Sequence, residues 1–550
     1  MKKFIFLIAF IAVILFFGRN LNPFSDTVFT FHDETQPARI QQFVTELRNL
    51  HIPPRLAPDF SFKMGYPVFN FYAPSSYWIT SAFSLVGFDT VNALKLSFLL
   101  SILVGFIAAY LFLKEYFDFF PSLTGAVLYI SSLYYPLDIF VRGNLGEVWF
   151  LALFPLALYF VERNSKKPNS FLFFFLTISL SFLFTVHNLL SAVSVLLVFG
   201  FILIHPHKKI NLLAMIFALL LSSYFLLPMM LENNLTYASY VATLTKYWDH
   251  FVCPSQLWQS AWGFGGSTKG CVDGMSFKIG KLQLIFAFMG MILFIFMSFQ
   301  SRIAVRDKLR RESRFFSNWI PDQVRNDKRI KTYFIPYSLF FILLTLGSLF
   351  MSTYLSKPLW DALSPILSLF QFPWRFIAFS LVGIAFFAAF FLDAITFKFK
   401  NIFLVFLILF LIINYSKYFS GQSVSKQRFE KTYLSKEYIE QKVAYKIAEY
   451  LPRTANYSIW RTYEKTPPKK AMINIHYFPF WKIFIDGKTY VPTKFDELGR
   501  PMIDSKKDSN IQILYKETPI EKLGNFITIL SFGILLYTVK SRKLWNRLRG

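Results

Sequence analysis

Two adjacent carboxylates, Asp33 and Glu34, stand in the stretch FHDETQPARI (31–40). A carboxylate can act as a general base on an attacking hydroxyl when its surroundings match its pKa to that task. The stretch closely follows an apolar run, in whose first eighteen residues Lys2 and Lys3 are the only charges. This carboxylate pair is therefore expected to lie at a membrane boundary.

Other polar residues are predicted to reach the same boundary from separate segments of the chain. They are Arg55 of HIPPRLAP, Tyr66 of MGYPVFNFYAP, Arg142 and Glu147 of VRGNLGEVW, His187 and Asn188 of TVHNLL, and Arg375 of FQFPWRF. Arginine suits a phosphate because its planar guanidinium can bond two phosphate oxygens. We therefore expect Arg142 and Arg375 to neutralise a phosphate. Asp33 is the candidate base, and Glu34 assists it or holds a cation.

Each of these residues also has a simpler explanation when it is taken alone. Arg142 and Glu147 are five residues apart and can pair with each other. Arg375 can anchor the chain at the membrane interface, and His187 can cap a helix at a turn. Joint placement favours a functional site, because charges near a bilayer are costly and are usually found at pathways, partners or sites.

Apolar helices must position these groups. The chain has 550 residues, of which 54% are hydrophobic and 16% charged, and its mean hydropathy is +0.42. This composition is typical of a multi-pass membrane protein. We expect a mainly α fold with about twelve transmembrane helices, since a span needs roughly 20 apolar residues. They are predicted near 4–18, 96–113, 120–137, 146–161, 170–186, 189–205, 211–231, 282–300, 333–355, 374–392, 402–418 and 525–539.

The first apolar run is expected to be an uncleaved anchor, because FFGRN offers no small-residue cleavage site; a signal peptide is the alternative. The net charge of +26 follows the positive-inside rule, so a nucleic-acid partner is not expected. The linker 301–332 carries ten Lys or Arg against four Asp or Glu, and 540–550 carries five against none. Both termini are therefore predicted to be cytoplasmic. The other basic segments on that side are 162–169, 205–211 and 397–401.

This orientation divides the chain into three parts. Residues 1–418 form a transmembrane region with outer loops 19–95 and 232–281. Residues 419–524 form a small extracytoplasmic α+β domain, and 525–550 hold the last transmembrane helix and a basic tail. Within the domain, 424–450 is predicted to be helical, and alternation around DGK (486–488) predicts a β-hairpin.

The only two cysteines, Cys253 and Cys271, fall in the outer loop 232–281. In an oxidising compartment, a disulfide between them would close this loop and contribute about 3 kcal/mol to stability. Two free buried thiols are the alternative. No Walker A sequence and no G-x-G-x-x-G sequence is present, so nothing indicates nucleotide binding.

The order of these motifs resembles the GT-C superfamily of integral membrane glycosyltransferases. Within it, the chain resembles bacterial multi-pass proteins described as 6-pyruvoyl-tetrahydropterin-synthase-related membrane proteins. The features shared are FHDETQPARI, HIPPRLAPDFSFKMGYPVFNFYAP, RGNLGE, the HN after the fifth predicted helix, FQFPWRF and YFPFWKIFIDGK. Each motif is short, and the resemblance covers most of residues 1–540.

The resemblance implies hexosyl transfer from a polyprenyl-phosphate donor to a glycan, lipid or protein acceptor on the outer face of a prokaryotic cytoplasmic membrane. It also implies that an aspartate of the first loop is the base, sometimes with a divalent cation such as Mg²⁺ or Mn²⁺. By position Asp33 matches this aspartate, Glu34 competes for the role, and either could hold the cation. The partners implied are the donor, membrane lipids and the acceptor.

Two other classes of function remain open. A transporter or flippase for lipid-linked saccharides would place polar residues at mid-membrane and on both faces, whereas the predicted helices are nearly free of charge. A non-catalytic envelope assembly protein would use its outer domain to bind partners. In that case Asp33→Asn should have no effect.

Overall fold

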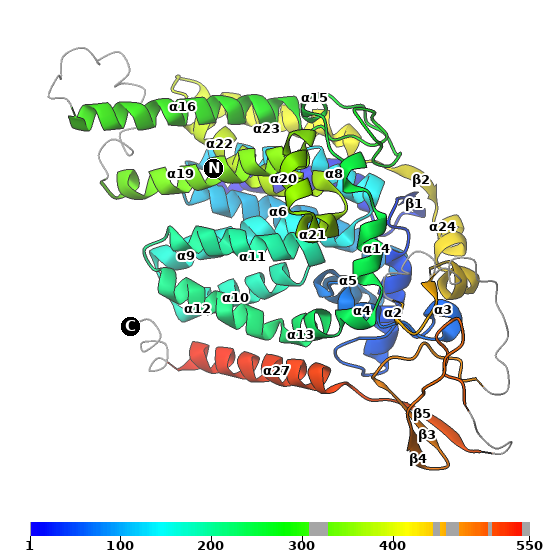
Figure 1. Cartoon of the computed structure of the whole chain (residues 1–550). Coiled ribbons are helices and arrows are strands. Elements are labelled where there is room, and N and C mark those ends of the chain that lie inside the picture. The colour runs from blue at the N-terminus through cyan, green and yellow to red at the C-terminus, as the bar shows by residue number, and fades with distance from the viewer. Residues whose placement is uncertain (1, 307–327, 444–450, 458–471, 504–508, 542–550) are drawn as a thin grey trace.

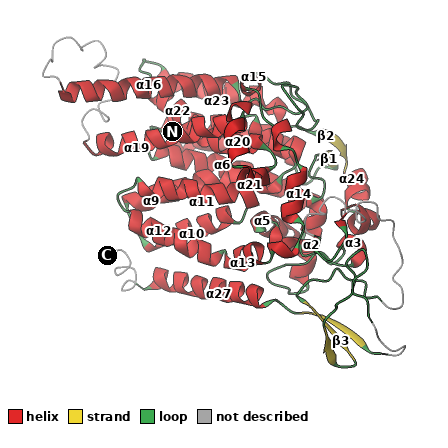
Figure 2. Cartoon of the chain, viewed as in Figure 1, coloured by secondary structure: helices red, strands yellow, loops and turns green. Residues whose placement is uncertain are grey.

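The computed structural model describes residues 2–306, 328–443, 451–457, 472–503 and 509–541. Long helices run side by side in a bundle, and the strands and several short helices gather at one end of it (Figure 1). We call this end the strand end. Figure 2 shows that helix dominates the described residues and that strand is confined to small regions. The predicted mainly helical class with a small strand-containing region near the C-terminus is therefore confirmed.

The helices of the bundle and its strand end are, in chain order, α1 (Lys2–Phe17), α2 (Gln36–Arg48), α5 (Ser75–Leu85), α6 (Thr90–Lys114), α7 (Phe119–Ile130), α9 (Leu145–Lys166), α10 (Ser170–Phe184), α11 (Asn188–Leu203), α12 (Lys208–Leu221), α13 (Ser223–Leu231), α16 (Lys281–Arg306), α19 (Lys328–Ser352), α22 (Ile377–Ala394), α23 (Lys400–Tyr415) and α27 (Pro519–Lys540). Shorter helices are α3 (Phe60–Lys63), α4 (Val68–Phe71), α8 (Tyr134–Leu137), α14 (Ala238–Leu244), α15 (Pro254–Trp258), α20 (Lys357–Ala362), α21 (Ser364–Leu367) and α24 (Lys426–Tyr433).

Six helical segments are long and apolar enough to cross a membrane, or seven if the bent pair α12 and α13 is one span. The six are Thr90–Lys114, Phe119–Arg142, Leu145–Lys166, Pro373–Ala394, Lys400–Tyr418 and Pro519–Lys540. The expected twelve spans are therefore not seen among the described residues. Further apolar helices, such as α10 and α11, are shorter because Asn169 and His187 cap their first turns. At 1.5 Å per residue, a helix of about 16 residues falls short of a hydrocarbon core about 30 Å thick.

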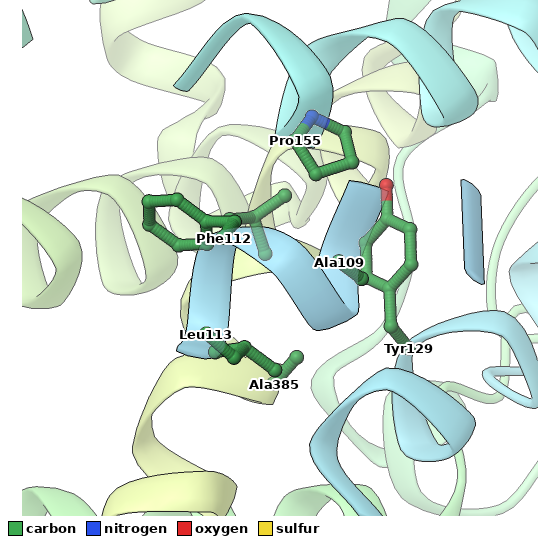
Figure 3. A pocket seen from close by; sticks show the side chains of 7 residues that line it. Ala109, Phe112, Leu113, Tyr129, Pro155 and Ala385 are labelled. Atoms are coloured by element: carbon green, nitrogen blue, oxygen red, sulfur yellow. The ribbon is translucent and has the colours of Figure 1, made fainter. Parts of the chain in front are cut away.

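A small apolar pocket lies in the bundle, lined by Ala109, Phe112, Leu113, Tyr129, Pro155, Val382 and Ala385 (Figure 3). Pro155 stands inside α9 and has no N–H to donate to the carbonyl of Leu151, four residues earlier. The hydroxyl of Tyr129 donates a 2.6 Å hydrogen bond to that carbonyl instead. A side chain of α7 thereby satisfies the acceptor that the proline leaves open in α9.

Two distant segments meet at the strand end. Strand β1 (Thr27–Thr30) pairs antiparallel with β2 (Gln422–Ser425), with Thr27 opposite Ser425 and Thr30 opposite Gln422. Below this sheet, the rings of Phe17 and Phe419 stack with their centroids 4.0 Å apart. The segment after α23 therefore packs directly on the segment after α1.

A second sheet precedes α27, with strand order β4-β3-β5 and antiparallel pairing throughout. Its strands are β3 (Trp481–Ile485), β4 (Lys488–Tyr490) and β5 (Ile511–Tyr515). The predicted hairpin is confirmed: Asp486 and Gly487 connect β3 to β4 with φ of 51° and 75°. Positive φ at both central residues is what a two-residue hairpin turn of type I′ requires.

Only part of the predicted helix 424–450 is described. It begins as β2, continues as α24 and then forms a π-helical turn at Tyr438–Lys442; residues 444–450 lie outside the described ranges. Most of the basic linker 301–332 and most of the basic tail also lie outside them.

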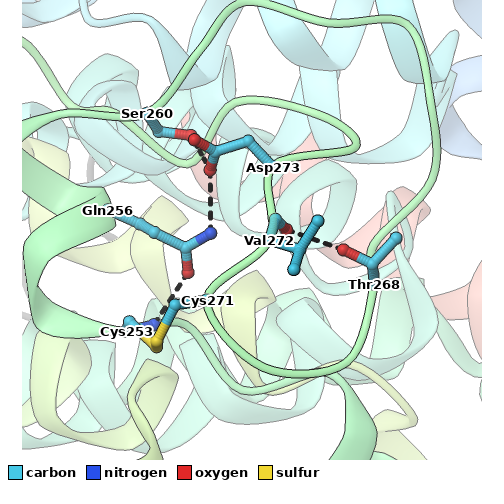
Figure 4. The surroundings of a disulfide bond; sticks show 7 residues. All are labelled: Cys253, Gln256, Ser260, Thr268, Cys271, Val272 and Asp273. Atoms are coloured by element: carbon cyan, nitrogen blue, oxygen red, sulfur yellow. Dashed lines mark hydrogen bonds between the residues drawn. A yellow bond between two sulfur atoms is a disulfide. The ribbon is translucent and has the colours of Figure 1, made fainter.

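The segment from Cys253, just before α15, to the start of α16 is cross-linked by a disulfide between Cys253 and Cys271, as expected from the sequence (Figure 4). Inside it, the carboxylate of Asp273 accepts hydrogen bonds from Gln256 Nε2 at 2.8 Å and from the Ser260 hydroxyl at 2.5 Å. Burial raises the pKa of Asp273, but these hydrogen bonds outweigh burial and lower it. The loop is therefore held by a covalent bond and by an ionised carboxylate.

Candidate functional site

The first candidate residue, Asp33, is attached by its backbone to the chain at Arg142. The N–H of Asp33 donates a 2.8 Å hydrogen bond to the carbonyl of Arg142, and the N–H of His32 donates to Val141 at 3.0 Å. The next residue, Gly143, has φ of 64°, and a Cβ there would overlap the ring of Phe31. A glycine is therefore required where the two segments cross.

Glu147 lies at the centre of a buried polar cluster. Asn144 caps α9 by accepting a 2.9 Å hydrogen bond from the N–H of Glu147, which places this side chain in the first helical turn. Its carboxylate contacts both terminal nitrogens of Arg142, one at 3.1 Å. It also accepts from Arg375 Nε at 2.9 Å and from the hydroxyl of Tyr134 at 3.1 Å. Three described residues, Arg142, Arg375 and Tyr134, thus donate to one carboxylate.

Arg142 has a second carboxylate partner. It contacts Asp138, four residues earlier, across the π-helical turn Asp138–Arg142. Its guanidinium also lies 4.2 Å from the centroid of the Trp374 ring. The simple pairing of Arg142 with Glu147 that the sequence allows is therefore present, but it belongs to a larger cluster. Arg142 and Arg375 thus contact two buried acidic side chains, Asp138 and Glu147.

His187 joins this cluster from the turn between α10 and α11. Its Nδ1 accepts hydrogen bonds from the N–H groups of Leu189 and Leu190, both at 3.3 Å, so it caps α11. Since Nδ1 is an acceptor, the proton of the neutral ring is on Nε2, which lies 3.5 Å from the Glu147 carboxylate. Burial lowers the pKa of His187 to about 3, although Glu147 opposes this. The imidazole is therefore neutral near pH 7.

Asp33 faces a different set of groups from Glu147. Burial raises the pKa of the Tyr72 hydroxyl, the positive charge of Arg39 opposes this, and the carboxylate of Asp33 raises it further. Arg375 also lowers the Tyr72 pKa, so Asp33, Arg39 and Arg375 all act on one phenol. The Arg39 guanidinium lies 4.1 Å from the centroid of the Tyr72 ring. The half-buried Asp33 and the two arginines therefore all lie near the hydroxyl of Tyr72.

Sequence reasoning did not single out Arg39, Tyr72, Asp138 or Tyr134 as members of the site. Arg39 stands six residues after Asp33, in the first turn of α2, and Tyr72 stands in the aromatic stretch MGYPVFNFYAP. The only indication of Arg39 and Tyr72 in the sequence was that they stand close to the motifs selected as site candidates. Asp138 carries a clearer signal, because it is an acidic residue inside an apolar run and four residues before an arginine.

Two predicted site residues, Arg55 and Tyr66, have partners elsewhere. Arg55 donates to Asn70 and to Asn525 of α27, both at 2.9 Å, and so ties the first segment to the last helix. The ring of Tyr66 packs edge-on against His476, with centroids 6.0 Å apart. Asn188 has a supporting role nearer the site.

The side chain of Asn188 holds the backbone on either side of Tyr72. Its Oδ1 accepts from the N–H of Ala73 at 2.7 Å, and its Nδ2 donates to the carbonyl of Phe71 at 2.5 Å. His187 contacts the Glu147 cluster, and Asn188 holds the backbone on either side of Tyr72. These two adjacent residues therefore connect the Glu147 cluster to Tyr72.

Few side chains of the described residues are placed to coordinate a divalent cation at this site. In the described part of the chain, no three His, Cys, Asp or Glu side chains are grouped closely enough to hold a metal. Asp33 and Glu34 offer two carboxylates, and Mg²⁺ commonly completes its shell with water and substrate phosphate oxygens. The residues thus fit a loosely held Mg²⁺ better than a metal caged by protein.

The arrangement combines buried arginines with a carboxylate, Asp33, for which no side-chain hydrogen bond is seen among the described residues. Asp33 has the half-buried position of a group that meets substrate, whereas Glu147 is fully buried and saturated with donors. A comparison with models of protein families finds no match for this chain, and a comparison with curated proteins finds none either.

Proposed function

We propose that this protein is a GT-C-type membrane glycosyltransferase. It transfers a sugar from a polyprenyl-phosphate donor to an acceptor hydroxyl at the outer face of a prokaryotic cytoplasmic membrane. The observation that carries the proposal is the position of Asp33: a half-buried carboxylate, bonded through its N–H to Arg142 and acting with Arg375 on one phenol. A carboxylate and an arginine that both act on one phenol support a base working beside a phosphate-binding cation.

The chemistry assigns one task to each group. The acceptor oxygen forms a bond to the anomeric carbon while the bond from that carbon to the phosphate oxygen breaks. The acceptor proton passes to the carboxylate of Asp33, and the leaving phosphate keeps the electron pair of the broken bond. A guanidinium stabilises the negative charge of that phosphate. A single displacement of this kind inverts the anomeric configuration.

The glycan and lipid content of cells tests the proposal. Cells expressing the wild-type chain or Asp33→Asn, at matched protein levels, would be compared by mass spectrometry of membrane lipids and envelope glycans. We expect the variant to accumulate a hexose-bearing polyprenyl phosphate and to lose one glycosylated envelope product. Asp26→Asn is the matched control, because Asp26 is an exposed aspartate of the same segment.

The adjacent Glu34 needs its own variant. If Asp33→Asn is silent while Glu34→Gln abolishes the product, the base is Glu34 and transfer still stands. If both single variants and the double variant leave the lipids and glycans unchanged, the transferase proposal is wrong.

A bent helix pair favours a second candidate, a flippase for lipid-linked saccharides. The axes of α12 and α13 differ by 67° across a short break, and discontinuous helices frame the substrate sites of many transporters. Near the break, Arg55 donates a 3.0 Å hydrogen bond to the carbonyl of Tyr224. A flippase should move a fluorescent lipid-linked saccharide across vesicles containing the purified protein. Arg55→Gln should slow that movement, and Asp33→Asn should not.

A further inference from the structure

The two arginines of the Glu147 cluster, Arg142 and Arg375, differ in how many of their hydrogen-bond donors are already used. Arg142 contacts two fully buried carboxylates, Asp138 and Glu147, and its guanidinium face lies on Trp374. Only 6% of its side chain is exposed. A phosphate could reach Arg142 only by displacing one of these partners, which would leave a buried carboxylate unpaired. Such a charge is strongly destabilising.

Arg375 uses fewer of its hydrogen-bond donors than Arg142 does. Its Nε donates to Glu147 and its Nη1 donates to the carbonyl of Phe370, both at 2.9 Å. Its Nη2 has no hydrogen-bond partner among the residues that the structure describes. Its side chain is 11% exposed, while that of Glu147 is fully buried. Arg375 therefore keeps one donor available without losing its carboxylate partner.

The position of Arg375 also relates it to the candidate base. Its charge acts on the Tyr72 hydroxyl together with that of Asp33. Arg142 is connected to Asp33 through its backbone carbonyl, not through a described side-chain contact. The available donor and the candidate base thus border the same phenol.

We propose that Arg375, and not Arg142, contacts the donor phosphate, and that Arg142, Glu147 and Asp138 form a buried unit that positions it. Arg142 and Glu147 are then positioning residues and not phosphate ligands. This division of roles rests on the proposed function, because it presumes that the site binds a lipid phosphate.

Binding of a lipid phosphate without any sugar tests the division. Purified protein in detergent micelles would be titrated with a polyprenyl monophosphate, and with the polyprenol of the same length that lacks the phosphate. Arg375→Gln should weaken binding of the phosphate form at least tenfold without changing the binding of the polyprenol. Arg375→Lys should recover part of the loss, because an ammonium keeps the charge but not the fork of donors.

Arg142→Lys should bind the polyprenyl phosphate as the wild type does, although its melting temperature should fall. Arg19→Gln is the matched control for loss of one positive charge, since Arg19 bonds the carbonyl of Ser416 and is not part of the cluster. It should leave binding unchanged. In a transfer assay, Arg375→Gln should raise the KM for the donor more than it lowers kcat.

The outcomes separate the two proposals. If the wild type prefers the phosphate form and Arg375→Gln binds it equally well, the assignment of Arg375 is wrong and the proposed function stands. The same holds if a folded Arg142→Lys loses as much affinity as Arg375→Gln. If the wild type does not distinguish the two lipids, the proposed function itself fails. If Arg142→Lys does not fold, comparing the affinity of Arg375→Gln for the polyprenyl monophosphate with that of Arg19→Gln still tests whether Arg375 contacts the phosphate.

Discussion

Arg375 Nε lies 2.9 Å from the Glu147 carboxylate, and 228 residues separate the two in the chain. The contact joins the start of α9 to the segment just before α22, and the chain between them includes several helices of the bundle and the disulfide loop. The Glu147 carboxylate also accepts a hydrogen bond from Arg142, so one carboxylate contacts both Arg142 and Arg375. This residue determines the geometry of the site more than any other residue described.

Removing the charge of Glu147 should destabilise the protein strongly. Glu147→Gln leaves two arginines against Asp138 alone, and breaking a buried ionic network costs roughly 3–5 kcal/mol. We expect a fall of several degrees in the melting temperature of the detergent-purified protein. Glu115→Gln is the control, because its partners Arg163 and Lys166 are 44% and 39% exposed and such pairs contribute about 1 kcal/mol or less. Equal shifts for the two variants would contradict this account of the cluster.

The crossing at Gly143 should not tolerate a side chain. In Gly143→Ala the positive φ costs about 1–2 kcal/mol, and the new methyl group must also displace the ring of Phe31. Both melting temperature and activity should fall, because Phe31 stands two residues before Asp33. Gly266→Ala should be neutral, since a Cβ there meets nothing within 4 Å. A double variant with Phe31→Ala should regain part of the stability but not the activity.

Stability should depend on pH through His187. Burial lowers the pKa of this residue to about 3 in the folded protein, against 6.5 ordinarily. Between these values the unfolded chain binds more protons, so the free energy of unfolding falls as the pH drops from 6.5 towards 3. One group contributes up to about 1.4 kcal/mol per pH unit. Above pH 6.5 it contributes no slope.

The measurement is thermal unfolding at several pH values between 7.5 and 4.5. His187→Asn retains a residue that caps helices well, and it should reduce the loss of melting temperature on acidification. Burial lowers the pKa of His476 to about 3 as well, so part of the slope should remain. The exposed His207, changed to Asn, should leave the slope as it is. An unchanged slope in His187→Asn would refute the assignment.

The disulfide should stabilise the loop that reaches the site. Cys253 and Cys271 are 18 residues apart, and the loop places Phe277 against Trp374, with ring centroids 6.1 Å apart. Replacing both cysteines with serine should cost about 3 kcal/mol. Denatured wild-type protein should show no free thiol on titration without reductant and two after reduction. Two thiols without reductant would mean that the bond does not form.

Tyr129 and Pro155 should be energetically coupled. Tyr129→Phe leaves the carbonyl of Leu151 without its donor, which costs about 1–3 kcal/mol for a buried group. Pro155→Ala restores the N–H that an α-helix would supply, so the tyrosine change should cost much less in that background. Thermal unfolding of the four proteins of this cycle measures the coupling. Additive effects would show that the hydroxyl does not compensate for the proline.

The number of spans shows where local patterns mislead. The predicted run 189–205 corresponds to α11, but this helix, Asn188–Leu203, has only 16 residues and is too short to count as a span. The predicted bend-free span 211–231 is two helices, α12 and α13, whose axes differ by 67°. Hydropathy depends only on the residues of a short stretch, whereas the ends and bends of a helix also depend on the residues that pack against it.

The sequence by itself determined features that depend on neighbouring residues: the mainly helical class, the turn at Asp486 and Gly487, and the choice of Asp33, Arg142, Glu147, His187 and Arg375 as unusual polar residues. Only the tertiary structure decided their relationships. It paired Glu147 with two arginines, turned Arg55 and Tyr66 towards other partners, and brought Tyr72 to Asp33. Residue type states what a side chain can bond to. The packing of distant segments decides which of several possible partners the side chain contacts. A buried charge pairs with the opposite charge that the fold places beside it.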